Sequence, residues 1–113
     1  MVEIKDVRFG EIDVDGRTYY SDVAIFWDGK VEMVEKKHVF DINDLMYLLS
    51  KGANIIVIGT GIEGLCKIEQ EAFDMAEGKG IDIYIEKSKK AAKLFNLFAK
   101  SGEKVAAIIH TTG

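Results

Sequence analysis

The stretch Asn54–Gly64 reads NIIVIGTGIEG, and it decides how the second half of the chain is expected to fold. Its apolar run is continuous rather than alternating, which is typical of a strand buried on both faces of a parallel sheet. Gly59, Gly61 and Gly64 follow with the spacing G-x-G-x-x-G, which in dinucleotide-binding domains lies between a strand and a helix. The stretch therefore favours an α/β fold and raises the question of whether its turn binds a nucleotide.

The pattern downstream continues the alternation of strands and helices. Apolar residues recur at helical spacing over 65–76, and 81–86 reads as a second strand. Ser88 can cap a further helix that stops at Gly102, and 104–109 reads as a third strand. This β-α-β-α-β order predicts parallel strands with helices packed on the sheet.

Upstream, the sequence predicts strands and tight turns. The Asp-Gly pairs at 15–16 and 28–29 each separate two short apolar runs, and Asp-Gly supplies the positive φ of a hairpin turn. They predict a β-meander, in which Asp13 serves turn chemistry rather than metal binding. Asp41 is expected to cap a short helix that ends at Gly52. The expected fold is a single compact α/β domain, with N-terminal antiparallel hairpins packed against a mixed sheet, and not a full Rossmann fold.

One observation favours a dinucleotide site at the glycine motif, and others argue against it. Glu86 ends the strand after the motif, near where a ribose-binding acid belongs. However, residues 53–113 hold only one mononucleotide-type half, and the front half is antiparallel and acidic. No cofactor is therefore predicted, and a polar or anionic ligand at the turn stays open. No metal is predicted either, because two histidines and one cysteine lack ligand spacing.

Composition excludes several functional classes. The chain has 15 Lys and Arg against 19 Asp and Glu, a net charge of −4, which argues against a nucleic-acid partner. One cysteine permits no intrachain disulfide, and with no apparent signal peptide it indicates a cytoplasmic protein. No run approaches the ~20 apolar residues that span a membrane. The absence of proline and the abundance of Glu and Lys fit a heat-adapted protein.

Polar residues are expected to meet at one edge of the sheet. Thr60, Glu86 and His110 each close a predicted strand, and parallel sheets place functional groups at the carboxyl ends of their strands. Cys66 falls in the first turn of the helix expected after Gly64. It is either a nucleophile activated there or a buried, inert cysteine, and the two histidines lie far from it in the sequence.

Several segments together resemble a known family. They are FGEIDVDGRTYYSDV, NIIVIGTG, GIDIYIE, AAKLFNLFAKSGEKVAAIIH and the closing HTTG. In this order and spacing they resemble the adipogenesis-associated Mth-type domain, a domain of unknown function that spans nearly the whole chain here. The family's relatives include human cytosolic and mitochondrial proteins, one of them an assembly factor for respiratory complex I.

The resemblance implies a compact α/β domain over 1–113 with no settled activity. Gly59, Thr60 and Gly61 match the family's glycine turn, and Asn96 and His110 match its recurrent polar positions. Where many relatives have a cysteine at the end of the chain, this one has Gly113.

Two functional hypotheses follow. The first is a ligand-binding or protein-assembly module with a pocket near Gly59, Thr60, Gly61, Asn96 and His110, whose partner is a protein or a small anion. The alternative is a small enzyme that uses an anion-binding pocket at the glycine turn, with His110 as acid/base. A homo-oligomer also stays open, because the front strands are rich in aromatic residues.

Overall fold

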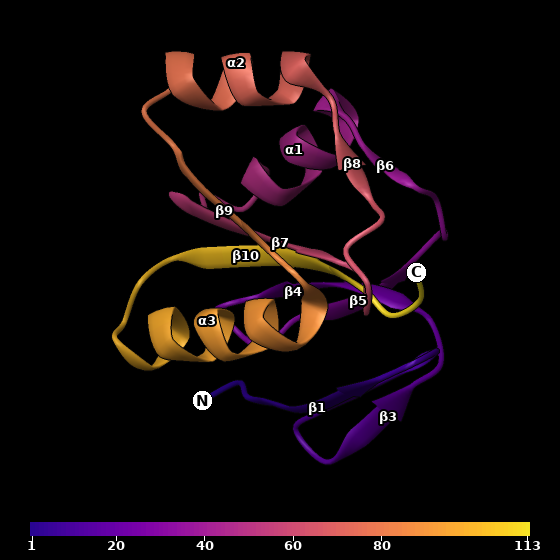
Figure 1. The fold of residues 1–113 in the computed structure, drawn as a ribbon. Helices are drawn as coiled ribbons and strands as arrows, with labels where there is room; N and C mark the ends of the chain where they lie inside the picture. Colours follow the sequence, from indigo (N-terminus) through magenta and orange to yellow (C-terminus); the bar gives the residue numbers. More distant parts are fainter.

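The computed structural model describes all 113 residues, which form one α/β domain of ten strands and three helices. A five-stranded mixed sheet in the order β5-β4-β10-β7-β9 runs through the middle of the molecule (Figure 1). Its strands are β4 (Asp22–Phe26), β5 (Val31–Val34), β7 (Ile55–Thr60), β9 (Asp82–Glu86) and β10 (Val105–His110). No helix of the structure is both long and apolar enough to cross a membrane.

The β-α-β-α-β prediction is confirmed for the second half of the chain. Strands β7, β9 and β10 pair in parallel, and the crossovers run through α2 (Gln70–Gly78) and α3 (Ser88–Lys100). Both β7 and β10 are buried over their whole length, as their continuous apolar sequences require. Strand β4 then joins β10 on its other side in antiparallel orientation.

The front of the chain forms its own small antiparallel sheet, with β1 (Ile4–Arg8), β2 (Glu11–Val14) and β3 (Arg17–Tyr19) in that order. The Asp-Gly pair at 15–16 makes the predicted two-residue turn, with φ of 50° and 82°. The pair at 28–29 lies in the longer β4–β5 connection. The expected single meander is wrong in one respect, because β4 and β5 leave this sheet and join the central one.

Two apolar cores lie on opposite faces of the central sheet. On one face pack α3 and the three-stranded sheet, with Phe95 fully buried between them. On the other face pack α2 and α1 (Ile42–Leu49), with Leu45 and Leu48 fully buried. Figure 1 shows these layers above and below β10.

Helix α1 begins as predicted. Asp41 accepts a hydrogen bond from the Asp44 amide, and the Asp44 carboxylate accepts one from the Asp41 amide. This capping box satisfies two backbone donors that the first helical turn leaves free.

The start of the next helix differs from the prediction. Residues 61–69 form a loop and the short strand β8 (Lys67–Ile68), which pairs with β6 (Val39–Phe40), and α2 begins only at Gln70. Positive φ angles at Gly61 and Gly64 interrupt the helical path between them. Cys66 therefore lies in a loop and not in a first helical turn.

Ser88 also differs from its predicted role. It is the first residue of α3, and Lys87 precedes it as an N-cap without a side-chain hydrogen bond. The Ser88 hydroxyl instead accepts a hydrogen bond from the Gly61 amide at 2.9 Å and donates one to the His110 carbonyl. It thus ties α3 to the carboxyl ends of β7 and β10.

Candidate functional site

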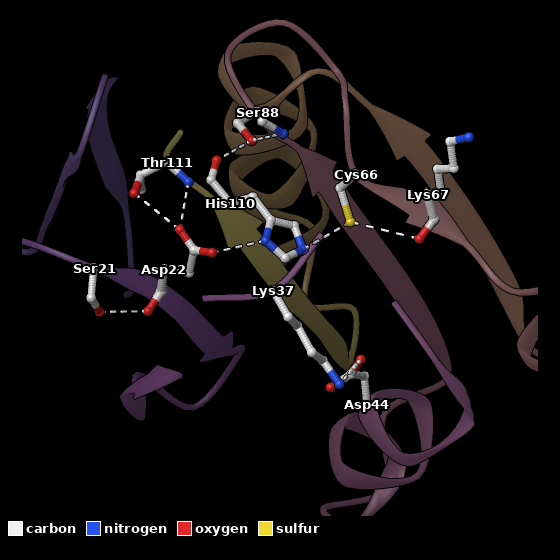
Figure 2. A network of polar contacts seen from close by, with 10 residues as sticks. Ser21, Asp22, Lys37, Asp44, Cys66, Lys67, Ser88, His110 and Thr111 are labelled. Carbon is white, nitrogen blue, oxygen red and sulfur yellow. Dashed lines mark hydrogen bonds and ion pairs between the residues drawn. The ribbon is translucent and has the colours of Figure 1, made fainter. Parts of the chain in front are cut away.

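Three side chains from distant parts of the sequence meet at the carboxyl edge of β10 (Figure 2). His110 is the last residue of β10, and Asp22 is the first residue of the antiparallel neighbour β4. The pairing of Ile109 with Val23 brings Asp22 beside His110. Cys66 reaches the same place from the loop that follows β7, because β7 ends alongside β10.

The contacts join a thiol, an imidazole and a carboxylate in one row. Atom Nδ1 of His110 lies 2.9 Å from Oδ2 of Asp22, and Nε2 lies 3.2 Å from Sγ of Cys66. An ionised carboxylate can only accept, so Nδ1 carries a proton and donates it to Asp22. The imidazole thus joins the carboxylate to the thiol through its two different nitrogens, as in Ser-His-Asp and Cys-His-Asn sites.

Asp22 is itself held in place by the residue after His110. Its Oδ1 accepts hydrogen bonds from the Thr111 amide at 2.8 Å and the Thr111 hydroxyl at 3.1 Å. Both carboxylate oxygens are therefore engaged. Asp22, Cys66 and His110 are only 3%, 8% and 5% exposed, so water competes little for these contacts.

These hydrogen bonds determine the charges of His110 and Asp22. Burial by itself lowers the pKa of His110, but the hydrogen bond to Asp22 and the contact with Cys66 outweigh burial and raise it to about 9. Burial raises the pKa of Asp22, while hydrogen bonds from His110 and Thr111 outweigh it and hold that pKa below its usual value. At neutral pH the site holds an imidazolium between a carboxylate and the sulfur.

An exposed segment without regular structure, Glu35–His38, crosses over this site between β5 and β6. We name it the strap. It includes Lys37, whose ammonium is 3.1 Å from Asp41 and 3.0 Å from Asp44 at the start of α1. Figure 2 shows this lysine passing beside His110 toward Asp44.

Two cavities adjoin His110 beneath the strap. The larger holds about 190 Å³ and is lined by Val34, Glu35, Lys37, Asp44, Ile108 and His110. The smaller, over the Cys66 sulfur, holds about 10 Å³, which is room for one water molecule at most. The larger cavity therefore gives small molecules room beside the imidazole, whereas the sulfur itself is closely covered.

The glycine turn is filled by the chain's own last residues. A Cβ on Gly61 would lie 2.4 Å from the Thr112 carbonyl oxygen, and one on Gly59 would lie 2.9 Å from the Ser88 hydroxyl. The amides of Glu63 and Leu65 donate to the Gly113 carbonyl at 3.0 and 3.1 Å. The glycines thus let residues 112–113 of the same chain pack closely against the turn. The Glu63 and Leu65 amides, which a phosphate would need here, are already bonded to Gly113.

The remaining predicted site residues are divided between the site and the fold. Thr60 pairs with His110 across β7 and β10 and lines the smaller cavity, while its hydroxyl donates to the Glu86 carbonyl. Asn96 lies elsewhere, on α3, where its amide group bonds both the N–H and the C=O of Ile4 at 2.8 Å. The structure therefore brings Thr60 to His110 but does not bring Asn96 there.

Sequence patterns alone predicted neither a role for Asp22 nor the contact of Cys66 with His110. Asp22 opens the otherwise apolar strand DVAIF, and a carboxylate at the start of a buried strand was the available signal. Pairing it with His110 requires the antiparallel contact of β4 with β10, which links residues 88 positions apart. Within the structure, no group of three or more His, Cys, Asp or Glu side chains is arranged to hold a metal ion.

Fold and site together define a small α/β domain with a buried Cys-His-Asp triad, formed by Cys66, His110 and Asp22, at the carboxyl edge of its sheet. A family model described as "Protein of unknown function (DUF498/DUF598)" matches residues 4–110, and the chain belongs to this family. The resemblance to the Mth-type domain is confirmed.

Solved structures share this fold. A conserved hypothetical protein, PH1505 from Pyrococcus horikoshii OT3, is 27% identical, with a TM-score of 0.86 over 98% of this chain and 99% of that one. A protein named MT938 is 28% identical, with a TM-score of 0.85 over the whole of both chains. An Mth938-like domain from Bordetella pertussis is 13% identical with a TM-score of 0.72, covers 98% of this chain and 86% of that one, and supports the fold alone.

Proposed function

We propose that this domain is a small thiol enzyme that transfers or hydrolyses acyl groups, with Cys66 as the nucleophile. His110 is its acid and base, and Asp22 is the residue that positions His110. The observation that carries the proposal is the geometry of this triad. Nδ1 of His110 faces the buried carboxylate of Asp22, and Nε2 faces the only thiol, that of Cys66. His110 keeps the acid/base role predicted from the sequence. The group that works with it is now the Cys66 thiol and not an anion-binding pocket at the glycine turn.

The charge state of His110 supports a thiolate mechanism. At neutral pH the imidazolium lies 3.2 Å from the sulfur, and a neighbouring cation favours the negatively charged, nucleophilic form of a cysteine. In the proposed mechanism the sulfur reacts as the thiolate while His110 holds the proton. Asp22 stabilises this imidazolium and fixes its orientation, so that Nε2–H points at the reacting sulfur.

The proposed reaction has two steps. The Cys66 sulfur attacks the carbonyl carbon of an ester, thioester or amide, and a new S–C bond forms as the bond to the leaving group breaks. Nε2–H of His110 gives its proton to the leaving group. In the second step neutral His110 accepts a proton from water or another acceptor, whose oxygen attacks the acyl carbon and releases the Cys66 thiolate.

The test is acylation of the single cysteine by p-nitrophenyl acetate. We expect release of one equivalent of p-nitrophenolate per protein and a matching acetyl mass on the peptide that contains Cys66. Cys66→Ala should abolish this burst, and His110→Gln and Asp22→Asn should slow it. Asp82→Asn, at the exposed start of β9 and at the end of the sheet opposite His110, is the matched control and should leave the burst intact. Equal release by wild type and Cys66→Ala, with no acetyl mass, would contradict the proposal.

The binding or assembly module stays a prediction, as do a cytoplasmic location and a protein or homo-oligomeric partner. The same variants separate the two functions. An assembly role depends on the surface and should survive Cys66→Ser, because this change is buried and nearly isosteric. A thiol enzyme loses its activity with that change.

A further inference from the structure

We infer that the substrate of this site is anionic and that the strap, through Lys36, recognises its negative charge. The inference rests on the proposed thiol function and adds to it the chemical class of substrate. It also moves the expected anion site away from the glycine turn and places it above the sulfur.

The first observation is the charge of the residues that cover the thiol. The small cavity over Cys66 is lined by Asp22, Lys36, Lys37, His38, Thr60, Leu65, Cys66, His110, Thr112 and Gly113. Its only acidic member is Asp22, whose two oxygens are already bonded to His110 and Thr111. Lys36 therefore brings to this opening a positive charge that no acidic side chain of the lining balances, although the whole chain has a net charge of −4. A cationic opening on an acidic protein attracts anions selectively.

The second observation distinguishes the two lysines of the strap. Lys37 is held by Asp41 and Asp44, so most of its charge is neutralised locally. Lys36 is exposed and makes no ion pair in the structure. Glu35 lines the larger neighbouring cavity and not the space over the sulfur. Lys36 is consequently the cation free to meet a substrate carboxylate or phosphate.

The third observation concerns the route to the sulfur. The space over Cys66 is too small for a substrate, so a part of its lining must move before the sulfur can react. Exposed segments without regular structure are the parts of a protein that open most readily. A molecule that enters in this way passes the side chains of Lys36 and His38. The glycine turn offers no competing anion site, because the Glu63 and Leu65 amides are bonded to Gly113.

The test compares two alkylating reagents that differ in charge. Iodoacetate is an anion and iodoacetamide is neutral; each forms an S–C bond to cysteine and releases iodide. Because Cys66 is the only cysteine, intact mass gives its rate directly. The measured quantity is the ratio of the iodoacetate rate to the iodoacetamide rate at low salt, in the folded protein.

We expect Lys36→Gln to lower this ratio by about two- to fivefold, the usual size of an exposed charge interaction. Lys36→Arg should restore it, and added salt should weaken the preference. Lys104→Gln is the matched control: it removes the same charge from an exposed site just before β10, at the end of that strand opposite His110, and should leave the ratio unchanged.

The outcomes separate the two proposals. If Cys66 reacts with both reagents but Lys36→Gln leaves the ratio unchanged, the strap does not select anions and only this inference fails. If neither reagent modifies Cys66 in the folded protein, the sulfur is out of reach and the proposed thiol function fails together with it.

Discussion

Replacing Asp22 with Asn should destabilise the domain in a way that depends on pH. The carboxylate accepts a hydrogen bond from Nδ1 of His110 in a site shielded from water. An amide of the same shape can still accept from Thr111, but it cannot stabilise a buried imidazolium. In the variant the pKa of His110 should therefore fall, because burial favours the neutral ring and only the contact with Cys66 still opposes it.

The pKa of His110 sets the size of this effect. It rises from an ordinary value of 6.5 to about 9 in the folded protein. A group whose pKa is raised by folding stabilises the protein fully below its unfolded value, and this contribution is lost as the pH rises through the folded value. The difference corresponds to about 3 kcal/mol, since one unit is worth about 1.4 kcal/mol. Because the contact with Cys66 supplies part of the shift and remains in the variant, wild type should exceed Asp22→Asn by up to this amount at pH 6, and the gap should narrow above pH 9.

Urea unfolding, followed by the fluorescence of Trp27, measures this difference. Trp27 is the only tryptophan and packs against both apolar cores. The free energy of unfolding is compared for wild type and Asp22→Asn between pH 6 and pH 9.5, and again in a His110→Gln background. In that background the pH dependence of the Asp22→Asn effect should vanish. A gap that stays constant across this range in the wild-type background would refute the reasoning, because it would show that His110 is not charged at neutral pH.

The remaining predictions concern stability. Phe95→Ala should lower the free energy of unfolding by about 3–5 kcal/mol, because it removes a fully buried ring between α3 and the sheets. Thermal unfolding measures this loss, and a loss below about 1 kcal/mol would contradict the packing. Asn96→Ala should lower the free energy of unfolding by about 1–3 kcal/mol, because it leaves the N–H and C=O groups of Ile4 unpaired. The rate of Cys66 alkylation should not change, and a slower rate would link Asn96 to the site. Gly61→Ala should cost roughly 1–3 kcal/mol more than Gly102→Ala. Both glycines have positive φ, but only at Gly61 would a Cβ clash with the chain, so equal losses would count against the tight packing of the last residues on the turn.

Local patterns in the sequence predicted the local structure. The Asp-Gly pair at 15–16, the cap at Asp41 and the β-α-β-α-β alternation each depend on residues that are close in the chain, and each is confirmed. The start of α2 was predicted wrongly because the helical spacing of apolar residues began at Leu65. The hydrogen bonds that Gly113 accepts across the fold, and the pairing of β8 with β6, hold 61–69 out of a helix.

The site could be predicted only in part, because its contacts are long-range. His110 and Thr60 were expected to share a sheet edge, since parallel strands end together, and the register of β7 with β10 brings them side by side. The partners of His110 lie 44 and 88 positions away in the sequence. Nothing near Cys66 indicates a histidine, and only the antiparallel pairing of β4 with β10 places Asp22 within reach.

The protonation state of His110 decides whether the site holds an imidazolium between Asp22 and Cys66. Nitrogen-15 NMR of the two histidine rings, with His38→Gln to assign them, reports whether each ring nitrogen carries a proton. We expect both Nδ1 and Nε2 of His110 to be protonated at pH 7 and the ring to titrate at a pKa of about 9. A neutral His110 ring at pH 7, with a pKa at or below the ordinary 6.5, would contradict the imidazolium between Asp22 and Cys66 on which the proposed chemistry depends.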